Sequence, residues 1–165
     1  MQYNKQKDAS SSVFSLPPSI GKFLGLVIIG LVGTIAFDMV MYVDSAITGL
    51  PLEIPSVLGS LVVGDSEFAE PVGRVIHYGN GIGLALVFGF VALPISRKII
   101  GLPTIVYGII FGILELVVAV WFGMLPALGA GIAGTNVGPE VAIVTFLRHI
   151  AFGSVLGILV RSWRY

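Results

Sequence analysis

Cysteine is absent from this 165-residue chain, and charged residues are scarce. Without cysteine the protein forms no disulfide, no Cys-ligated zinc or iron–sulfur site, no cysteine nucleophile and no palmitoyl anchor. Charged residues make up 11 % of the chain and hydrophobic residues 56 %, with a mean hydropathy of +1.00. Soluble domains carry about a quarter charged residues. The composition therefore excludes a water-soluble globule and predicts an integral membrane protein.

Catalytic and nucleotide-binding motifs are also missing. The chain has neither the H-E-x-x-H motif of zinc peptidases nor the G-x-S-x-G motif of serine hydrolases. The spacing Gly129-x-Gly131-x-x-Gly134 matches a dinucleotide fingerprint, but no predicted strand precedes it. We expect a non-enzymatic protein, and no basic patch on the predicted external side indicates a nucleic-acid partner.

Four apolar stretches are long enough to cross a bilayer, which needs roughly 20 helical residues. They cover approximately residues 20–43, 72–96, 99–124 and 139–160. The prediction is an all-α, four-helix transmembrane bundle over residues 20–165, and the first span is interpreted as a true span rather than a cleaved signal peptide. The polar residues 1–19, with two adjacent prolines, predict a disordered cytoplasmic tail.

The two predicted external loops cover residues 44–71 and 125–138. The middle of the first loop, Ser56–Val63, is apolar but too short to cross, so we expect it to lie along the interface or over the helix ends. A plain loop is the simpler interpretation, and a lid is the alternative.

Orientation follows from the positions of Lys and Arg near the span ends. Seven of the nine basic residues fall on one side of the predicted bundle, which carries a net charge of +6, whereas everything else carries −6. These residues are Lys5, Lys7, Lys22, Arg97, Lys98, Arg161 and Arg164. The positive-inside rule therefore predicts both termini in the cytoplasm, in a prokaryotic cytoplasmic membrane.

Small residues recur four apart in every predicted span, a spacing that allows helix backbones to approach closely. The pairs are Gly30 and Thr34, Gly81 and Ala85, Gly108 and Gly112, and Gly153 and Gly157. We expect compact packing of the four helices, and the same spacing allows homo-oligomerisation.

Six ionisable residues lie within or beside the predicted spans, all in the outer half. They are Asp38, Arg74, His77, Glu115, Arg148 and His149. A charge facing lipid costs roughly 2.5–3.5 kcal/mol at the helix centre on insertion scales, so these side chains are expected to face inward and pair as one cluster. Glu115 and Arg148 match in predicted depth and are expected to form an ion pair, and Asp38 is expected to meet Arg74 or His77.

Three interpretations of this cluster remain open. It is a network that fixes helix register, or a site that binds or passes a proton, a cation or a polar solute. The third interpretation is a cofactor site, with a metal held by His77, His149, Glu115 and Asp38, or a haem iron held by the two histidines. No cofactor is the leading expectation, because two histidines are few.

Three segments carry a resemblance to a known family. They are His77-Tyr78-Gly79-Asn80-Gly81, the Gly108 and Gly112 helix that ends in Gly123-Met124-Leu125-Pro126, and Arg148-His149 followed by a basic exit at Arg161 and Arg164. In these the chain resembles the YagU-like small multi-pass inner-membrane proteins of prokaryotes. The resemblance implies a four-span bundle in which His77 and His149 belong to one site.

The function expected from the sequence is that of an accessory or structural subunit of a membrane complex, packed in the bilayer against a membrane-protein partner. The alternatives are a small transporter or binding protein for a proton, cation or polar solute, and a haem- or metal-binding subunit.

Overall fold

In a computed structural model of the protein, which describes residues 18–50, 52–99 and 101–162, every regular element is helical. Residues 1–17 of the predicted tail and the basic residues Lys5, Lys7 and Arg164 lie outside these described residues. Residues 18 and 19 belong to the first helix, so the tail prediction is wrong for these two residues. The elements, in order, are α1 (Pro18–Thr48), α2 (Ile54–Val63), α3 (Ala69–Val87), η1 (Phe88–Ala92), α4 (Leu93–Ile99), α5 (Thr104–Glu115), η2 (Leu116–Met124), α6 (Leu125–Ala127), η3 (Ile132–Gly134) and α7 (Pro139–Ser162).

Four continuous helical stretches are long and apolar enough to cross a membrane, as the composition predicts. They are Ile20–Thr48, Ala69–Ile99, Thr104–Ala127 and Pro139–Arg161. The second stretch ends at Ile99 and the third begins at Thr104, so Arg97 and Lys98 lie in the last turn of α4 and not in the connection. The predicted start of the third span at residue 99 is therefore wrong. Proline has a fixed φ and no N–H, so Pro103 stands outside α5 as its N-cap and delays the helix to Thr104.

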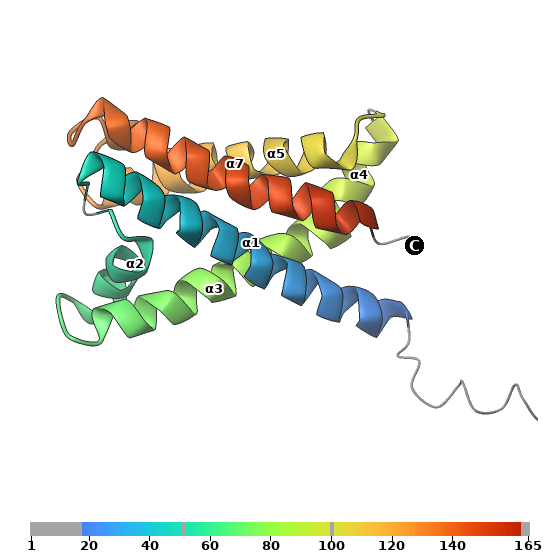
Figure 1. Cartoon of the computed structure of the whole chain (residues 1–165), viewed down its shortest axis with the longest axis horizontal. Helices are drawn as coiled ribbons and strands as arrows, with labels where there is room; N and C mark the ends of the chain where they lie inside the picture. Colours follow the sequence, from blue (N-terminus) through green and yellow to red (C-terminus); the bar gives the residue numbers. More distant parts are fainter. Residues whose placement is uncertain (1–17, 51, 100, 163–165) are drawn as a thin grey trace, which may run out of the picture.

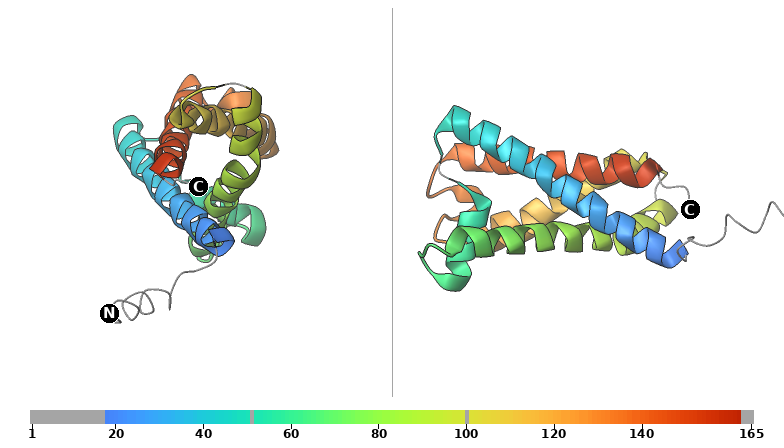
Figure 2. Two further views of the ribbon diagram at one scale, coloured as in Figure 1. Left: turned by 90° about the vertical axis from the view of Figure 1, so that its right-hand side faces the viewer. Right: turned by 60° about the horizontal axis from the view of Figure 1, so that its bottom comes forward.

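Packing joins the helices in the order α2, α3, α1, α7, α5 (Figure 1). α1 contacts both α3 and α7, α5 packs along α7, and α2 lies against α3. Viewed along the long axis, the four long helices surround a common centre (Figure 2). α3 makes no substantial contact with α5 or η2, and the two sides meet at η1 and α4 instead. We call the gap in packing between α3 and η2 the α3–η2 seam.

The small residues of the predicted stripes lie where the helix backbones touch. A Cβ atom added at Gly30 would lie 2.6 Å from Ile82 Cα, and one added at Gly108 would lie 2.2 Å from Gly153 O. Both distances are shorter than side chains tolerate, so only glycine allows α1 to cross α3, and α5 to cross α7, at this separation. The prediction of close packing through these stripes is confirmed.

Two π-helical segments interrupt the second and third long stretches, and neither was predicted. η1 ends two residues before Pro94, and η2 ends two residues before Pro126. Proline lacks an N–H and its ring clashes with the carbonyl four residues earlier. The backbone widens instead, and the Leu93 and Leu125 N–H groups donate to the carbonyls of Phe88 and Val120, five residues back.

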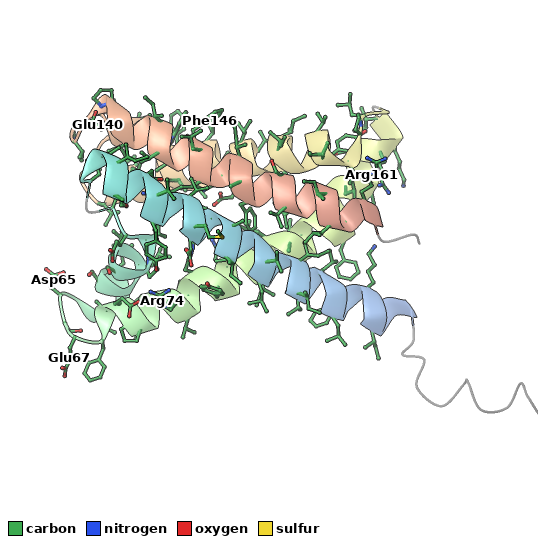
Figure 3. The ribbon with its side chains drawn as sticks, in the orientation of Figure 1. Asp65, Glu67, Arg74, Glu140, Phe146 and Arg161 are labelled. Atoms are coloured by element: carbon green, nitrogen blue, oxygen red, sulfur yellow. The ribbon has the colours of Figure 1, made fainter. Side chains whose placement is uncertain are left out.

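The apolar stretch in the first predicted loop forms a true helix, α2. It packs on α3, where α2 Gly59 and α3 Gly73 take up positions at which a Cβ would strike the facing backbone 1.6 Å away. We call the end of the molecule that holds α2 the α2 end. The acidic residues Asp65, Glu67 and Glu140 lie there, whereas Arg161 lies at the opposite end, where α1 begins and α7 ends (Figure 3).

Candidate functional site

A cavity of about 290 Å³ opens between the four long helices near the α2 end. α1 and α7 form its back wall with Phe37, Thr145 and Phe152, and α2 covers it with Ile54 and Leu58. Its volume is at the lower end of the range for small-molecule sites. The lining is mainly apolar, contains neither Lys nor Arg, and includes the ionisable residues His77, Glu115 and His149.

The first polar pair in this cavity joins α5 to α7. His149 Nε2 lies 2.8 Å from Glu115 Oε2, and both side chains are largely buried, with 7 % and 12 % of their surface exposed. His149 Nδ1 lies 2.6 Å from the Thr145 carbonyl oxygen, which can only accept, so Nδ1 carries a proton. Nε2 is then the ring nitrogen that faces the Glu115 carboxyl group.

The second pair joins α1 to α3. His77 Nε2 lies 3.0 Å from Asp38 Oδ1, and the Tyr78 hydroxyl donates to Asp38 Oδ2 over 3.1 Å. Both oxygens of the Asp38 carboxylate therefore have a partner. His77 and Asp38 are 10 % and 6 % exposed in their side chains. Adjacent residues of α3 supply the imidazole and the hydroxyl, so a single turn of helix satisfies this carboxylate.

Phe37 contacts both imidazoles. Its ring centroid is 5.1 Å from that of His77 and 5.2 Å from that of His149, and both contacts are edge-to-face. This geometry is favourable for aromatic rings. The two imidazoles and the aromatic ring that contacts both of them thus line one cavity.

The cavity reaches the surface of the molecule at the α3–η2 seam. Asn80 on α3 and Ala119 on η2 both line the cavity and are both exposed, whereas His77, His149 and Phe152 are buried. Because α3 and η2 do not pack on each other, these two residues form opposite rims of the opening. Within the part of the chain that the structure describes, the Asn80 side chain has no hydrogen-bond partner.

Arg148 lies outside the cavity and forms a closed contact of its own. Its Nε donates to Asp44 Oδ2 over 2.7 Å, its Nη2 donates to Asp44 Oδ1, and its Nη1 donates to the Leu52 carbonyl over 2.8 Å. The Arg148 side chain is 0 % exposed and that of Asp44 is 9 % exposed. We call this contact the Arg148 clamp. It ties the end of α1 and the segment before α2 to the middle of α7.

Arg74 is separate again. It pairs with Glu70 one turn earlier on α3, and the two side chains are 44 % and 47 % exposed. These exposed fractions identify a surface pair, and Figure 3 places Arg74 toward the α2 end.

The six ionisable residues predicted from the sequence thus fall into three places rather than one cluster. Asp38, His77, Glu115 and His149 are brought together around the cavity, whereas Arg148 and Arg74 are not. The predicted ion pair between Glu115 and Arg148 is wrong. Successive helical residues differ by about 100° in direction, so once His149 faces Glu115, Arg148 points toward α1.

Sequence reasoning missed Asp44, Phe37, Tyr78 and Thr145 as parts of these contacts. Asp44 sat one residue beyond the predicted first span, where the true helix continues to Thr48. Helical spacing could have identified Asp44. It lies six residues after Asp38 and therefore on a different face of the same helix, where it needs a partner on another element. Nothing in the sequence pairs Phe37 with two imidazoles on other helices.

The structure gives no support to the alternative of a metal or haem site. Among the described residues no group of three or more His, Asp and Glu side chains is placed to hold a metal ion. The Nε2 atoms of His77 and His149 each face a carboxylate oxygen, so neither is directed at a shared iron atom.

The chain belongs to DUF6789, a family of unknown function whose sequence pattern matches residues 22–165. This range contains every cavity residue and all of the four long helices except the first residues of α1. No curated protein and no solved structure shows a significant match to the chain. Nothing in these comparisons links it to the YagU-like proteins, so that resemblance adds no activity here.

Proposed function

We propose that this chain is a multi-pass membrane protein whose cavity binds a small ligand at the Glu115–His149 and Asp38–His77 pairs. One observation carries the proposal: the Glu115–His149 pair and the His77 imidazole, which is backed by Asp38, line a single cavity between the four long helices. Largely apolar cavities with a few convergent polar groups are the usual form of small-molecule sites.

A network that only fixed helix register would not require this empty space. The Arg148 clamp shows how the same protein closes a purely internal contact, with three hydrogen bonds to Arg148 and no exposed surface on that side chain. Glu115 and His149, by contrast, keep a face toward the cavity. A ligand that donates or accepts hydrogen bonds would meet groups that can do both, because an imidazole N–H donates and a carboxylate oxygen accepts.

The proposed location is a prokaryotic cytoplasmic membrane with both termini in the cytoplasm. Support comes from the separation of charge: Lys22, Arg97, Lys98 and Arg161 belong to the end where α1 begins and α7 ends, whereas the acidic residues gather at the α2 end. The cavity then lies in the outer half of the membrane.

Labelling of single cysteines tests this orientation, since the natural chain has none. Asp65→Cys should react with a membrane-impermeant maleimide on intact cells. Lys98→Cys should react only after the membrane is permeabilised. The reverse pattern would place both termini outside and overturn the orientation.

Native mass spectrometry tests ligand binding. The full chain is reconstituted in nanodiscs with a total lipid extract of the host membrane, which supplies candidate ligands. We expect a small non-covalent adduct on the natural protein, and about tenfold less of it on Glu115→Gln, for the loss of one charged hydrogen bond. Glu70→Gln, a surface carboxylate outside the cavity, is the matched control and should retain the adduct.

Absence of any adduct on the natural protein, or equal adducts on the two variants, would contradict the proposal. A co-purifying protein subunit without a small adduct would favour instead the accessory role that the chain's size predicts.

A further inference from the structure

The cavity opens sideways, at the depth of the acyl chains, and this restricts what can occupy it. Asn80 lies eleven residues into α3, or about 16 Å along the helix, and Ala119 lies eight residues before the end of α6, or about 12 Å. Both rims of the opening therefore sit well below the α2 end. α2 covers the cavity on the side of that end, with Ile54 buried against it.

The surface around the opening is apolar. Val75 and Val87 on α3 are 76 % and 48 % exposed, and Val118 and Phe122 on η2 are 69 % and 61 % exposed. Such surfaces suit contact with lipid tails. Asn80 stands out against them, because an exposed carboxamide without a hydrogen-bond partner is unfavourable in hydrocarbon. A polar group of an occupant in the opening would supply that partner.

The charge of the lining indicates a neutral occupant. No Lys or Arg lines the cavity to attract an anion. The carboxylates of Asp38 and Glu115 already face imidazoles, and the described residues contain no preformed metal-ion site. The pairs can form hydrogen bonds with a neutral oxygen group. An imidazole N–H or a carboxyl O–H can donate to a carbonyl or hydroxyl oxygen, and a carboxylate oxygen can accept from a hydroxyl group.

We infer that the cavity takes a neutral, lipid-soluble molecule with a ring-sized head that carries hydroxyl or carbonyl oxygen, and that this molecule enters from the bilayer through the α3–η2 seam. Its head reaches the two carboxylate–imidazole pairs past Asn80, and its apolar tail stays in the seam between η2 and α3. The cavity of about 290 Å³ holds such a head but not a whole lipid molecule. The inference rests on the proposed function and names the ligand class of that same site.

Photolabelling with two matched probes tests it. The protein is reconstituted in nanodiscs of phosphatidylethanolamine and phosphatidylglycerol. One probe is 4-dodecylphenol with a diazirine on its tail, and the other is dodecylbenzene with the same diazirine. Peptide mass spectrometry then measures labelling of residues 77–84 and 115–124. We expect the phenol to label these segments about fivefold more than the hydrocarbon, for one or two neutral hydrogen bonds.

Two neighbouring substitutions on η2 separate the opening from the lipid-facing surface. Ala119→Trp fills the rim and should reduce phenol labelling to the level of the hydrocarbon. Val118→Trp, one residue away but outside the cavity lining, should leave the difference between the probes unchanged. Asn80→Leu should lower phenol labelling and leave hydrocarbon labelling as it was.

Equal labelling by the two probes on the natural protein would overturn the inference, and this comparison needs no variant to fold. So would unchanged phenol labelling in Ala119→Trp. If the native spectra still show a small adduct that Glu115→Gln removes, the proposed binding function stands, and the ligand is a water-soluble one that passes α2.

Discussion

Two adjacent residues of α7, Arg148 and His149, belong to two different polar contacts of this molecule. Arg148 points into a closed contact that includes α1 and Leu52, with no exposed surface, whereas His149 points into a cavity and pairs with Glu115. Both are buried and both face a carboxylate. The difference is the space beside them: Arg148 does not line the cavity and has no exposed surface, whereas Glu115 and His149 both line it. Burial of an ionisable group in such a protein therefore indicates function only where unfilled space adjoins it.

The largest expected effect comes from breaking the closed region. Arg148→Met should destabilise the protein by about 3–5 kcal/mol, because it leaves the Asp44 carboxylate buried without its partner. Thermal unfolding in mild detergent measures the change. The double variant Asp44→Leu with Arg148→Met should recover much of the loss, since no lone charge then remains. A loss below about 1 kcal/mol in the single variant would show that the clamp is a minor contact.

A smaller loss is expected at the crossing of α5 and α7, which holds Glu115 beside His149. Gly108→Ala places a Cβ 2.2 Å from Gly153 O, so the helices must separate, at a cost of about 1–3 kcal/mol. Ligand adducts should fall as well. Gly83→Ala is the control, because its Cβ meets nothing within 4 Å and alanine favours the helix. Equal stability of the two variants would mean that this crossing is not tightly packed in the membrane.

A substitution at the cavity pair Glu115–His149 should instead affect ligand binding more than stability. Glu115→Gln keeps a hydrogen bond, since the amide can donate to His149 Nε2 while Nδ1 still donates to Thr145. We expect the free energy of unfolding to change by less than about 1 kcal/mol, together with loss of the adduct in native spectra. A loss of stability comparable to that of Arg148→Met would place this pair with the clamp and favour a register-fixing network.

The smallest effect is expected at the surface pair. Arg74→Gln should change the free energy of unfolding by about 0–1 kcal/mol, because both partners are nearly half exposed. The adduct should be unaffected, since neither Arg74 nor Glu70 lines the cavity. A loss of adduct in this variant would show that the outer end of α3 controls access to the site.

The packing surfaces were predicted more accurately than the polar contacts. Gly30, Gly108 and Gly153 predict close contact between helix backbones, because a residue with a Cβ would prevent it. The lack of a Cβ can be read directly from the sequence. The π-helical segments before Pro94 and Pro126 escaped prediction, although the prolines that accompany them were visible. Proline prevents the regular hydrogen bond to the carbonyl four residues earlier. A kink and a π-helical segment can both accommodate this loss, and packing against the neighbouring helices decides which one forms.

The sequence by itself determined four long apolar helices, their small-residue contacts and the separation of basic from acidic ends, because length, hydropathy and glycine spacing act locally along the chain. It also singled out the ionisable residues that could not face lipid. Only the tertiary structure decided which of them meet. The depth of a residue along a helix axis follows from its residue number. The direction of its side chain around the axis depends on how the helices cross and on the π-helical segments. A helix rotation of one residue, about 100°, would place Arg148 instead of His149 in the cavity.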